Sequence, residues 1–77
     1  MSMSGLNRDI RHLDRALDKM AEAAYFLGET NDWIAMAALY TLEGMMDDLG
    51  DRLAELREIR DVMNKMEEER NDRRANG

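Results

Sequence analysis

A fourteen-residue apolar stretch, Trp33–Met46, most strongly constrains what this chain can fold into. Its only charged residue is Glu43, although 36% of the whole chain is charged. A helix formed by this stretch is apolar on nearly every side, and such a helix must be buried or must bind a partner. A chain of 77 residues buries only about 60% of its unfolded surface, which is too little to surround this helix. The sequence therefore predicts an obligate partner, and we expect a second copy of the chain.

The composition indicates a single small all-α domain over residues 1–77. The chain contains no proline, and it is rich in the helix-forming residues Ala, Leu, Glu and Arg. It also lacks cysteine, which leaves oligomerisation as the common way to stabilise so short a chain. We expect a cytoplasmic protein without a signal peptide, because no continuous apolar run begins the chain. The uncharged run 33–42 is about half a membrane span, so no membrane association is expected.

Apolar residues near the N-terminus recur at alternating steps of four and three residues, the spacing of a heptad repeat. This spacing predicts a helix over about residues 5–27, ended by Gly28 in a left-handed conformation. The predicted turn covers residues 28–31, where Thr30 or Asn31 can cap the next helix. A turn this short predicts an antiparallel helical hairpin. The apolar positions, called the heptad seam below, are Leu6, Ile10, Leu13, Leu17, Met20, Ala24 and Leu27.

The same spacing predicts a second, long helix over about residues 32–67. A three-residue step from Leu56 to Ile59 shifts the repeat and predicts a stammer at that point. The alternative to one continuous helix is a break at Gly50, with Asp51 as the next cap. In this second helix the predicted heptad seam comprises Ala35, Leu39, Leu42, Met46, Leu49, Leu53 and Leu56, followed after the shift by Ile59, Met63 and Met66.

The two predicted helices differ in length, so part of the second helix has no intramolecular neighbour. The first helix reaches only about Leu56, which leaves residues 57–66 as an overhang that needs a partner or a fold-back. Residues 1–4 and 68–77 are expected to be frayed or disordered.

Large apolar side chains outside the seam favour dimerisation. Two hairpins packed face to face would cover them in a four-helix bundle with a two-fold axis. The thickest hydrophobic region is expected at the turn end of the hairpin. This surface can be dimer core, a docking groove for another protein, or both on different flanks. The predicted interface residues are Trp33, Met36, Ala37, Tyr40, Met45, Ile59 and Met63.

The net charge of −6 falls entirely on residues 29–51, which hold six carboxylates and no basic residue. The segments before and after it are each neutral. Such a surface repels nucleic acid and attracts a basic partner, so nucleic-acid binding is not expected. The predicted acidic surface comprises Glu43, Asp47, Asp48 and Asp51.

The sequence predicts no catalytic, cofactor or metal site. His12, the only histidine, lies at an outer heptad position among arginines, and the only serines, Ser2 and Ser4, lie at the N-terminus. No Ser-His-Asp arrangement is expected from these positions. Carboxylates spaced by four residues, such as Asp14 and Asp18, could suggest a di-metal centre in a bundle. They alternate with basic residues opposite the seam, which is typical of a salt-bridged surface.

The first functional hypothesis is a small non-enzymatic interaction module, a homodimeric hairpin that inhibits or adapts another protein. Mobile elements such as phages encode proteins of this size and kind. One alternative is an acidic decoy that mimics nucleic acid and blocks a DNA- or RNA-processing protein. The other is a structural coiled-coil component of a larger assembly.

Overall fold

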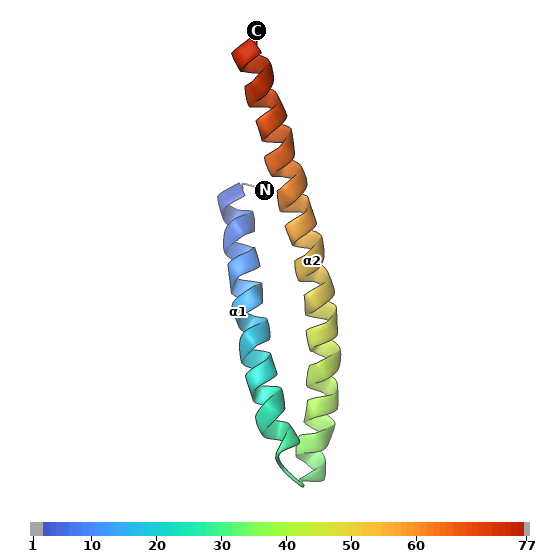
Figure 1. Ribbon diagram of the computed structural model, residues 1–77. Coiled ribbons are helices and arrows are strands. Elements are labelled where there is room, and N and C mark those ends of the chain that lie inside the picture. Colours follow the sequence, from blue (N-terminus) through green and yellow to red (C-terminus); the bar gives the residue numbers. More distant parts are fainter. Residues whose placement is uncertain (1–2, 77) are drawn as a thin grey trace.

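Two helices joined by a short turn form an antiparallel hairpin (Figure 1). The computed structural model describes the backbone of residues 3–76 and the side chains of residues 3–73. Helix α1 spans Met3–Gly28 and helix α2 spans Trp33–Asn76, and this part of the chain contains no strand. The hairpin is a rod measuring 67 × 17 × 15 Å. The predicted all-α hairpin is confirmed.

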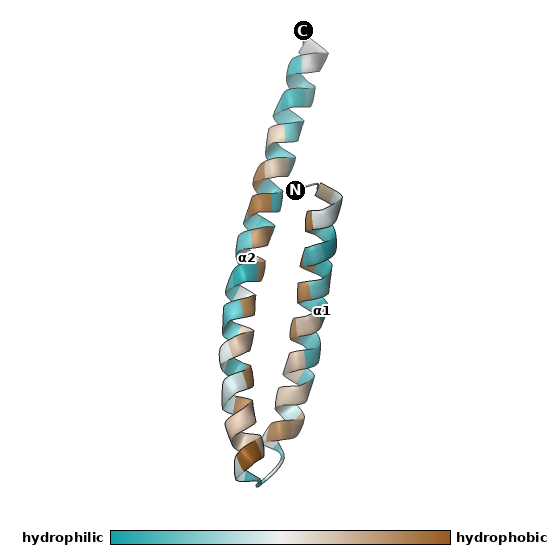
Figure 2. Cartoon of the chain, turned by 180° about the vertical axis from the view of Figure 1, so that it is seen from behind, coloured by the Kyte–Doolittle hydropathy of each residue, from teal (hydrophilic) through white to brown (hydrophobic). Residues whose placement is uncertain are grey.

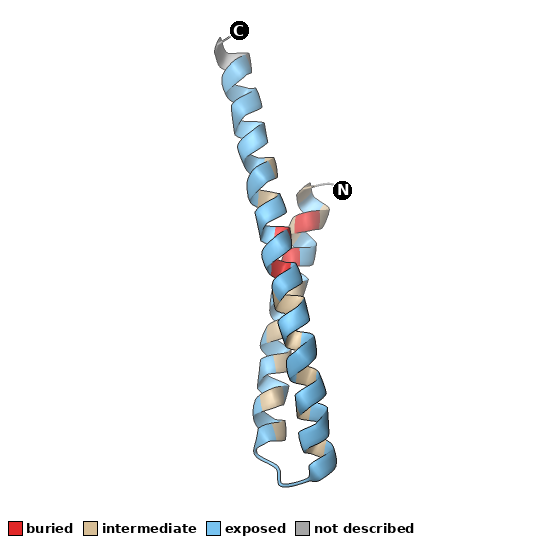
Figure 3. Ribbon diagram, turned by 90° about the vertical axis from the view of Figure 1, so that its right-hand side faces the viewer, coloured by how far each residue is buried: buried red, intermediate tan, exposed pale blue. Residues whose placement is uncertain are grey.

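The predicted heptad seam forms the contact between the helices. The hydrophobic residues of α1 line the side that faces α2 (Figure 2). Leu6 and Ile10 of α1 pack with Leu53 and Leu56 of α2, and none of the four is more than 6% exposed. The remaining predicted seam residues of both helices are half-buried, except Ile59 and Met66, which are exposed, so their assignment to the seam is wrong. Figure 3 places the buried residues near the N-terminal end of α1, far from the turn.

The seam continues past Leu56 without a change of register, so the predicted stammer is wrong. The next positions at steps of four and three are Arg60, which is half-buried, and Met63, which packs against the core. Ile59, the residue taken to shift the repeat, is 42% exposed. An arginine can occupy a seam position because its aliphatic stem packs while its guanidinium reaches water. Helix α1 therefore covers α2 as far as Met63, and the overhang begins after this residue rather than after Leu56.

Helix α2 is continuous through Gly50, so the alternative of a break there is wrong. No glycine among the described residues has the positive φ that a helix-ending C′ glycine adopts. The flanking seam residues Leu49 and Leu53 are half-buried and buried, and packing on both sides of the glycine favours a single helix.

The predicted end of the second helix at residue 67 is also wrong, since α2 extends to Asn76. Residues 68–76 contain neither glycine nor proline, and Glu69 precedes Arg73 by four residues, a spacing that stabilises helices. The N-terminal helix likewise begins at Met3 rather than near residue 5. Fraying of the helix ends in solution stays a prediction, and residues 1, 2 and 77 lie outside the described residues.

Helix α1 ends without the predicted left-handed glycine. Gly28 is its last residue, and its φ is not positive. The backbone N–H groups of Glu29 and Thr30 instead donate to the carbonyl oxygens of Phe26 and Leu27, each at 3.2 Å. The Thr30 hydroxyl also donates to the Leu27 carbonyl oxygen at 2.9 Å. These bonds tighten the last turn and satisfy carbonyl groups that the helix leaves unpaired.

Helix α2 is capped by Asp32, whereas the sequence favoured Thr30 or Asn31. The Asp32 carboxylate accepts a hydrogen bond from the backbone N–H of Ala35 at 2.9 Å. The Asp32 carbonyl oxygen accepts the first helical bond from Met36 at 3.0 Å. Both bonds are those of an N-cap residue, and the negative charge also complements the positive end of the helix dipole.

Candidate interaction surface

The hairpin exposes more surface than a compact protein of its mass. Its solvent-accessible surface is 6273 Å², whereas a compact 8.9-kDa monomer exposes about 4,800 Å². Its radius of gyration is 18.7 Å, against about 11–12 Å for a compact chain of this length. The excess of about 1,400–1,500 Å² per chain is larger than the roughly 800 Å² that each partner buries in a standard interface.

Large apolar side chains are exposed at the turn end of the hairpin. Trp33 and Tyr40 on α2 are 76% and 81% exposed, and Tyr25 and Phe26 on α1 are also exposed. The rings of Tyr25 and Phe26 meet edge to face, with centroids 5.5 Å apart. The turn end is therefore rich in apolar groups, as predicted, but the hairpin does not bury them.

The predicted interface residues lie on different sides of α2. A helix turns by about 100° per residue, which places Trp33, Met36, Ala37 and Tyr40 on one flank and the outer side. All four are exposed, and this group is called the aromatic flank below. On the opposite flank, Met45 and Ile59 are 51% and 42% exposed. Met63 is half-buried in the seam, where it packs against the core.

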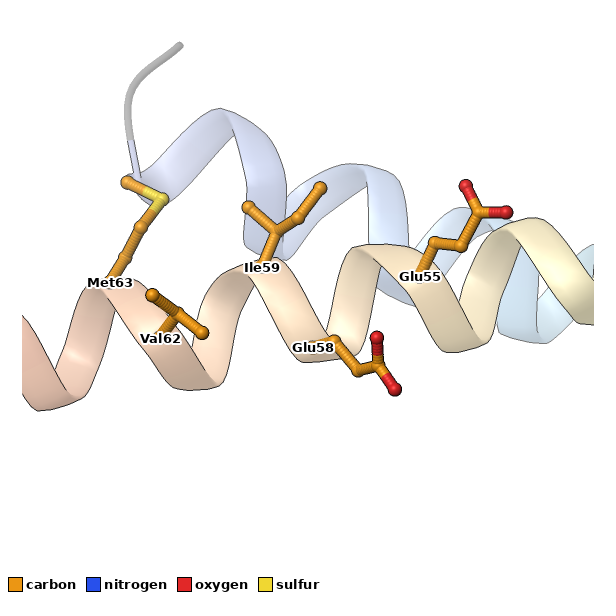
Figure 4. A pocket seen from close by; sticks show the side chains of 5 residues that line it. All are labelled: Glu55, Glu58, Ile59, Val62 and Met63. Carbon is orange, nitrogen blue, oxygen red and sulfur yellow. The ribbon is translucent and has the colours of Figure 1, made fainter.

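A shallow groove lies on the C-terminal half of α2, on the same flank as Met45 (Figure 4). Its apolar part is made by Ile59, Val62 and Met63, and its rim carries the carboxylates of Glu55 and Glu58. Val62 is 57% exposed, so an apolar group from another molecule can reach it.

Three exposed residues on this flank were missing from the predicted set: Ile34, Val62 and Met66. They stand three or four residues from Ala38, Ile59 or Met63, so the signal was a second heptad line beside the seam. The predicted interface contains Met45 and Ile59 of this line but not these three residues, because charged residues interrupt the line at its centre.

The four residues of the predicted acidic surface are all exposed. None of them belongs to an ion pair formed among the described side chains. Asp47 and Asp51 lie on the side of α2 away from the seam, Asp48 lies on the flank of Met45, and Glu43 lies on the aromatic flank. Asp47 and Asp51 are four residues apart on one helix, where like charges repel. A basic group from outside the hairpin would relieve that repulsion.

The described side chains do not form a metal centre, since no three His, Asp or Glu residues gather where they could hold an ion. His12 is exposed beside Asp9 and Arg52 in a shallow groove between the helices. In the part of the chain that the structure describes, neither helix has an apolar segment long enough to cross a bilayer.

A comparison of the chain with protein-family models, curated proteins and solved structures finds no match. Function is therefore inferred from the surface of the hairpin.

Proposed function

We propose that this chain is a non-enzymatic, homodimeric interaction module that binds and modulates another protein, as an inhibitor or an adaptor. The observation that carries the proposal is the contrast between a core of four buried residues and an extensive apolar surface at the turn end. The expected cytoplasmic location and the four-helix bundle belong to this same proposal.

The exposed surface favours a stable dimer rather than a transient contact. Covering the excess surface of two chains would bury roughly 2,900 Å², which falls in the range of obligate homodimers. Each large apolar side chain contributes about 1.5–3 kcal/mol when it becomes fully buried. A hairpin with only four buried residues needs such a contribution, because small domains are only marginally stable on their own.

Dimerisation is tested by light scattering and circular dichroism over a dilution series. We expect a mass of twice 8.9 kDa, with helicity and melting temperature falling together on dilution. A monomer that keeps its full helicity and stability contradicts the proposal. Concentration-dependent growth beyond a dimer instead favours the structural-assembly alternative. A stammer in the heptad repeat would have favoured that alternative, and the seam of the hairpin does not contain one.

Binding to another protein is tested by affinity capture from an extract of the native host with wild-type bait and a Tyr40→Glu bait. Tyr40 is 81% exposed, so a charge there should preserve the hairpin while disrupting an apolar contact. We expect a protein retained by the wild type to be lost from the variant. Ala54→Glu is the matched control, because it places the same charge on an exposed residue of α2 outside the aromatic flank, the seam and the second heptad line.

The acidic surface supports a second candidate, the nucleic-acid-mimicking decoy. Glu43, Asp47 and Asp51 are exposed and take part in none of the ion pairs of the described residues. Substituting all three by their amides removes their charge with little change in shape. A decoy should then lose its target, whereas an apolar docking module should bind almost as before. Retained binding after this substitution, together with loss in Tyr40→Glu, excludes the decoy.

A further inference from the structure

A second heptad line runs along α2 beside the seam, from Ile34 to Met66. Its positions follow the same alternating steps of four and three residues, so they share one side of the helix. This line, called the second stripe below, is charged in the middle and apolar towards both ends, with Thr41 as the single uncharged polar member. All of its apolar members are exposed on the hairpin. They are Ile34, Ala38 and Met45 towards the turn, and Ile59, Val62 and Met66 towards the C-terminus.

The centre of the second stripe carries charges of opposite sign. Asp48 and Arg52 stand four residues apart, and Glu55 follows Arg52, to which it is bonded at 2.8 Å. Read in either direction, the stripe is apolar, then charged, then apolar. When two such stripes pair antiparallel about an axis level with residue 50, Asp48 of each chain faces the partner's Arg52. The face is therefore self-complementary in charge at its centre. It is self-complementary in apolar residues at its ends, where Ile34 faces the partner's Met66 and Ala38 faces the partner's Val62.

The distribution of net charge favours the antiparallel pairing over the parallel one. Residues 29–51 carry all six units of negative charge, whereas residues 52–77 hold seven basic and seven acidic groups. A parallel pairing would stack the acidic segment on its own copy. The antiparallel pairing places it against the segment that supplies every basic residue of α2, which lowers the repulsion.

We propose that the second stripe is the dimer interface and that its occupant is the same stripe of a second copy, in antiparallel orientation. This inference rests on the homodimer of the proposed function. The groove at Ile59 and Val62 receives Ala38 from the partner, while Ile34 of the partner lies against Met66, and the same contacts recur at the other end of the interface. The small Ala38 side chain allows the backbones to approach, and the exposed area of each hairpin is sufficient for such an interface.

This geometry assigns separate roles to the two flanks of α2. The second stripe is used by the partner copy, so Trp33, Met36 and Tyr40 on the aromatic flank remain available. The dimer would present this flank twice, at opposite ends of the bundle, as the docking surface for the target protein.

Cysteine cross-linking tests the pairing, because the natural chain contains no cysteine. Ala38→Cys and Val62→Cys are prepared as separate full-length chains, mixed, and oxidised. The antiparallel stripe predicts a disulfide-linked dimer in the mixture and little cross-linking of either variant alone, since position 38 faces the partner's position 62. Ala37→Cys, on the outer side of the helix, is the matched control and should not cross-link with Val62→Cys. Circular dichroism establishes that every variant is helical.

The other outcomes overturn the pairing. Cross-links between two Ala38→Cys chains and between two Val62→Cys chains indicate a parallel dimer. If the wild type is a dimer by light scattering but only Ala37→Cys forms cross-links, the interface lies on the outer side of α2 instead. A wild-type monomer contradicts the homodimer of the proposed function as well, so the two failures are distinguishable.

Charge exchange gives a second, independent test. Asp48→Arg and Arg52→Asp each bring like charges together across the proposed axis, and each alone should weaken dimerisation by more than about tenfold. A mixture of the two variants restores both pairs and should form heterodimers. Dimers of either single variant as strong as wild type would contradict the proposed contact.

Discussion

The open end of the hairpin and its turn end follow the same heptad pattern but pack differently. At the open end, Leu6 and Ile10 meet Leu53 and Leu56, and these side chains are almost completely buried. At the turn end, the seam positions nearest the loop include alanines, and the largest side chains stand outside the seam. Trp33, for example, is 76% exposed. The leucines of the seam towards the turn, such as Leu39 and Leu42, are only half-buried, so a regular apolar pattern does not by itself produce a core.

The two ends of the hairpin therefore have different roles. The open end holds the two helices together, and the turn end is held by local bonds in the loop while it presents apolar groups to the outside. A surface of this kind on a small protein is typical of an interaction site. Substitutions at one end at a time test this difference.

The largest effect on stability is expected when a side chain in the core at the open end is truncated. Leu53→Ala should lower the free energy of unfolding by about 2–5 kcal/mol, because it removes a side chain that is only 3% exposed. Tyr40→Ala, which truncates a larger side chain at the turn end, should change it by less than about 0.5 kcal/mol. Urea denaturation at one protein concentration measures both. Equal losses would show that the two ends are equally well packed.

The cap of α2 is the next largest contribution and belongs to the turn end. Asp32→Ala removes the acceptor of the 2.9 Å bond from Ala35 and should cost about 1 kcal/mol. Asn31→Ala is the matched control, because it leaves that bond in place. Thermal unfolding followed by circular dichroism compares the two. A larger loss of thermal stability in the Asn31 variant would show that Asn31 rather than Asp32 caps α2.

The helix that joins the two ends should become more stable when its central glycine is replaced. A Cβ at Gly50 meets no atom within 4 Å, and its φ is not positive. Gly50→Ala should therefore raise the free energy of unfolding by about 0.5–1 kcal/mol. Gly44→Ala, also in open space, should act similarly and additively. Destabilisation by Gly50→Ala alone would indicate a helix break at that residue.

The smallest effect concerns the ion pair that links the helices towards the open end. Asp14 and Arg57 are 3.3 Å apart, and both side chains are about half exposed. A double-mutant cycle with Asp14→Asn and Arg57→Gln should give a coupling of about 0.2–1 kcal/mol. The coupling should shrink in 1 M salt, where exposed charges are screened. A coupling that is insensitive to salt would require a more deeply buried pair.

The heptad spacing alone determined the hairpin, its seam and the helical character of the chain. These features follow from local periodicity and from the absence of proline, so no long-range information was needed to predict them. The sequence also identified the apolar turn end and the exposed aromatic residues. Their use as a binding surface stays a proposal.

Only the tertiary structure decided three details: the residue that follows Leu56 in the seam, the residue that caps α2, and the position of the core. Arg60 keeps the seam in register because its stem packs while its charge stays in water, which a count of apolar residues cannot show. Asp32 rather than Asn31 caps α2, since the choice depends on the path of the loop. The core lies at the open end, whereas equally large seam residues such as Leu42 and Leu49 are only half-buried. Hydrophobic spacing does not determine this difference, because burial depends on how closely the side chains of the facing helix pack around each residue.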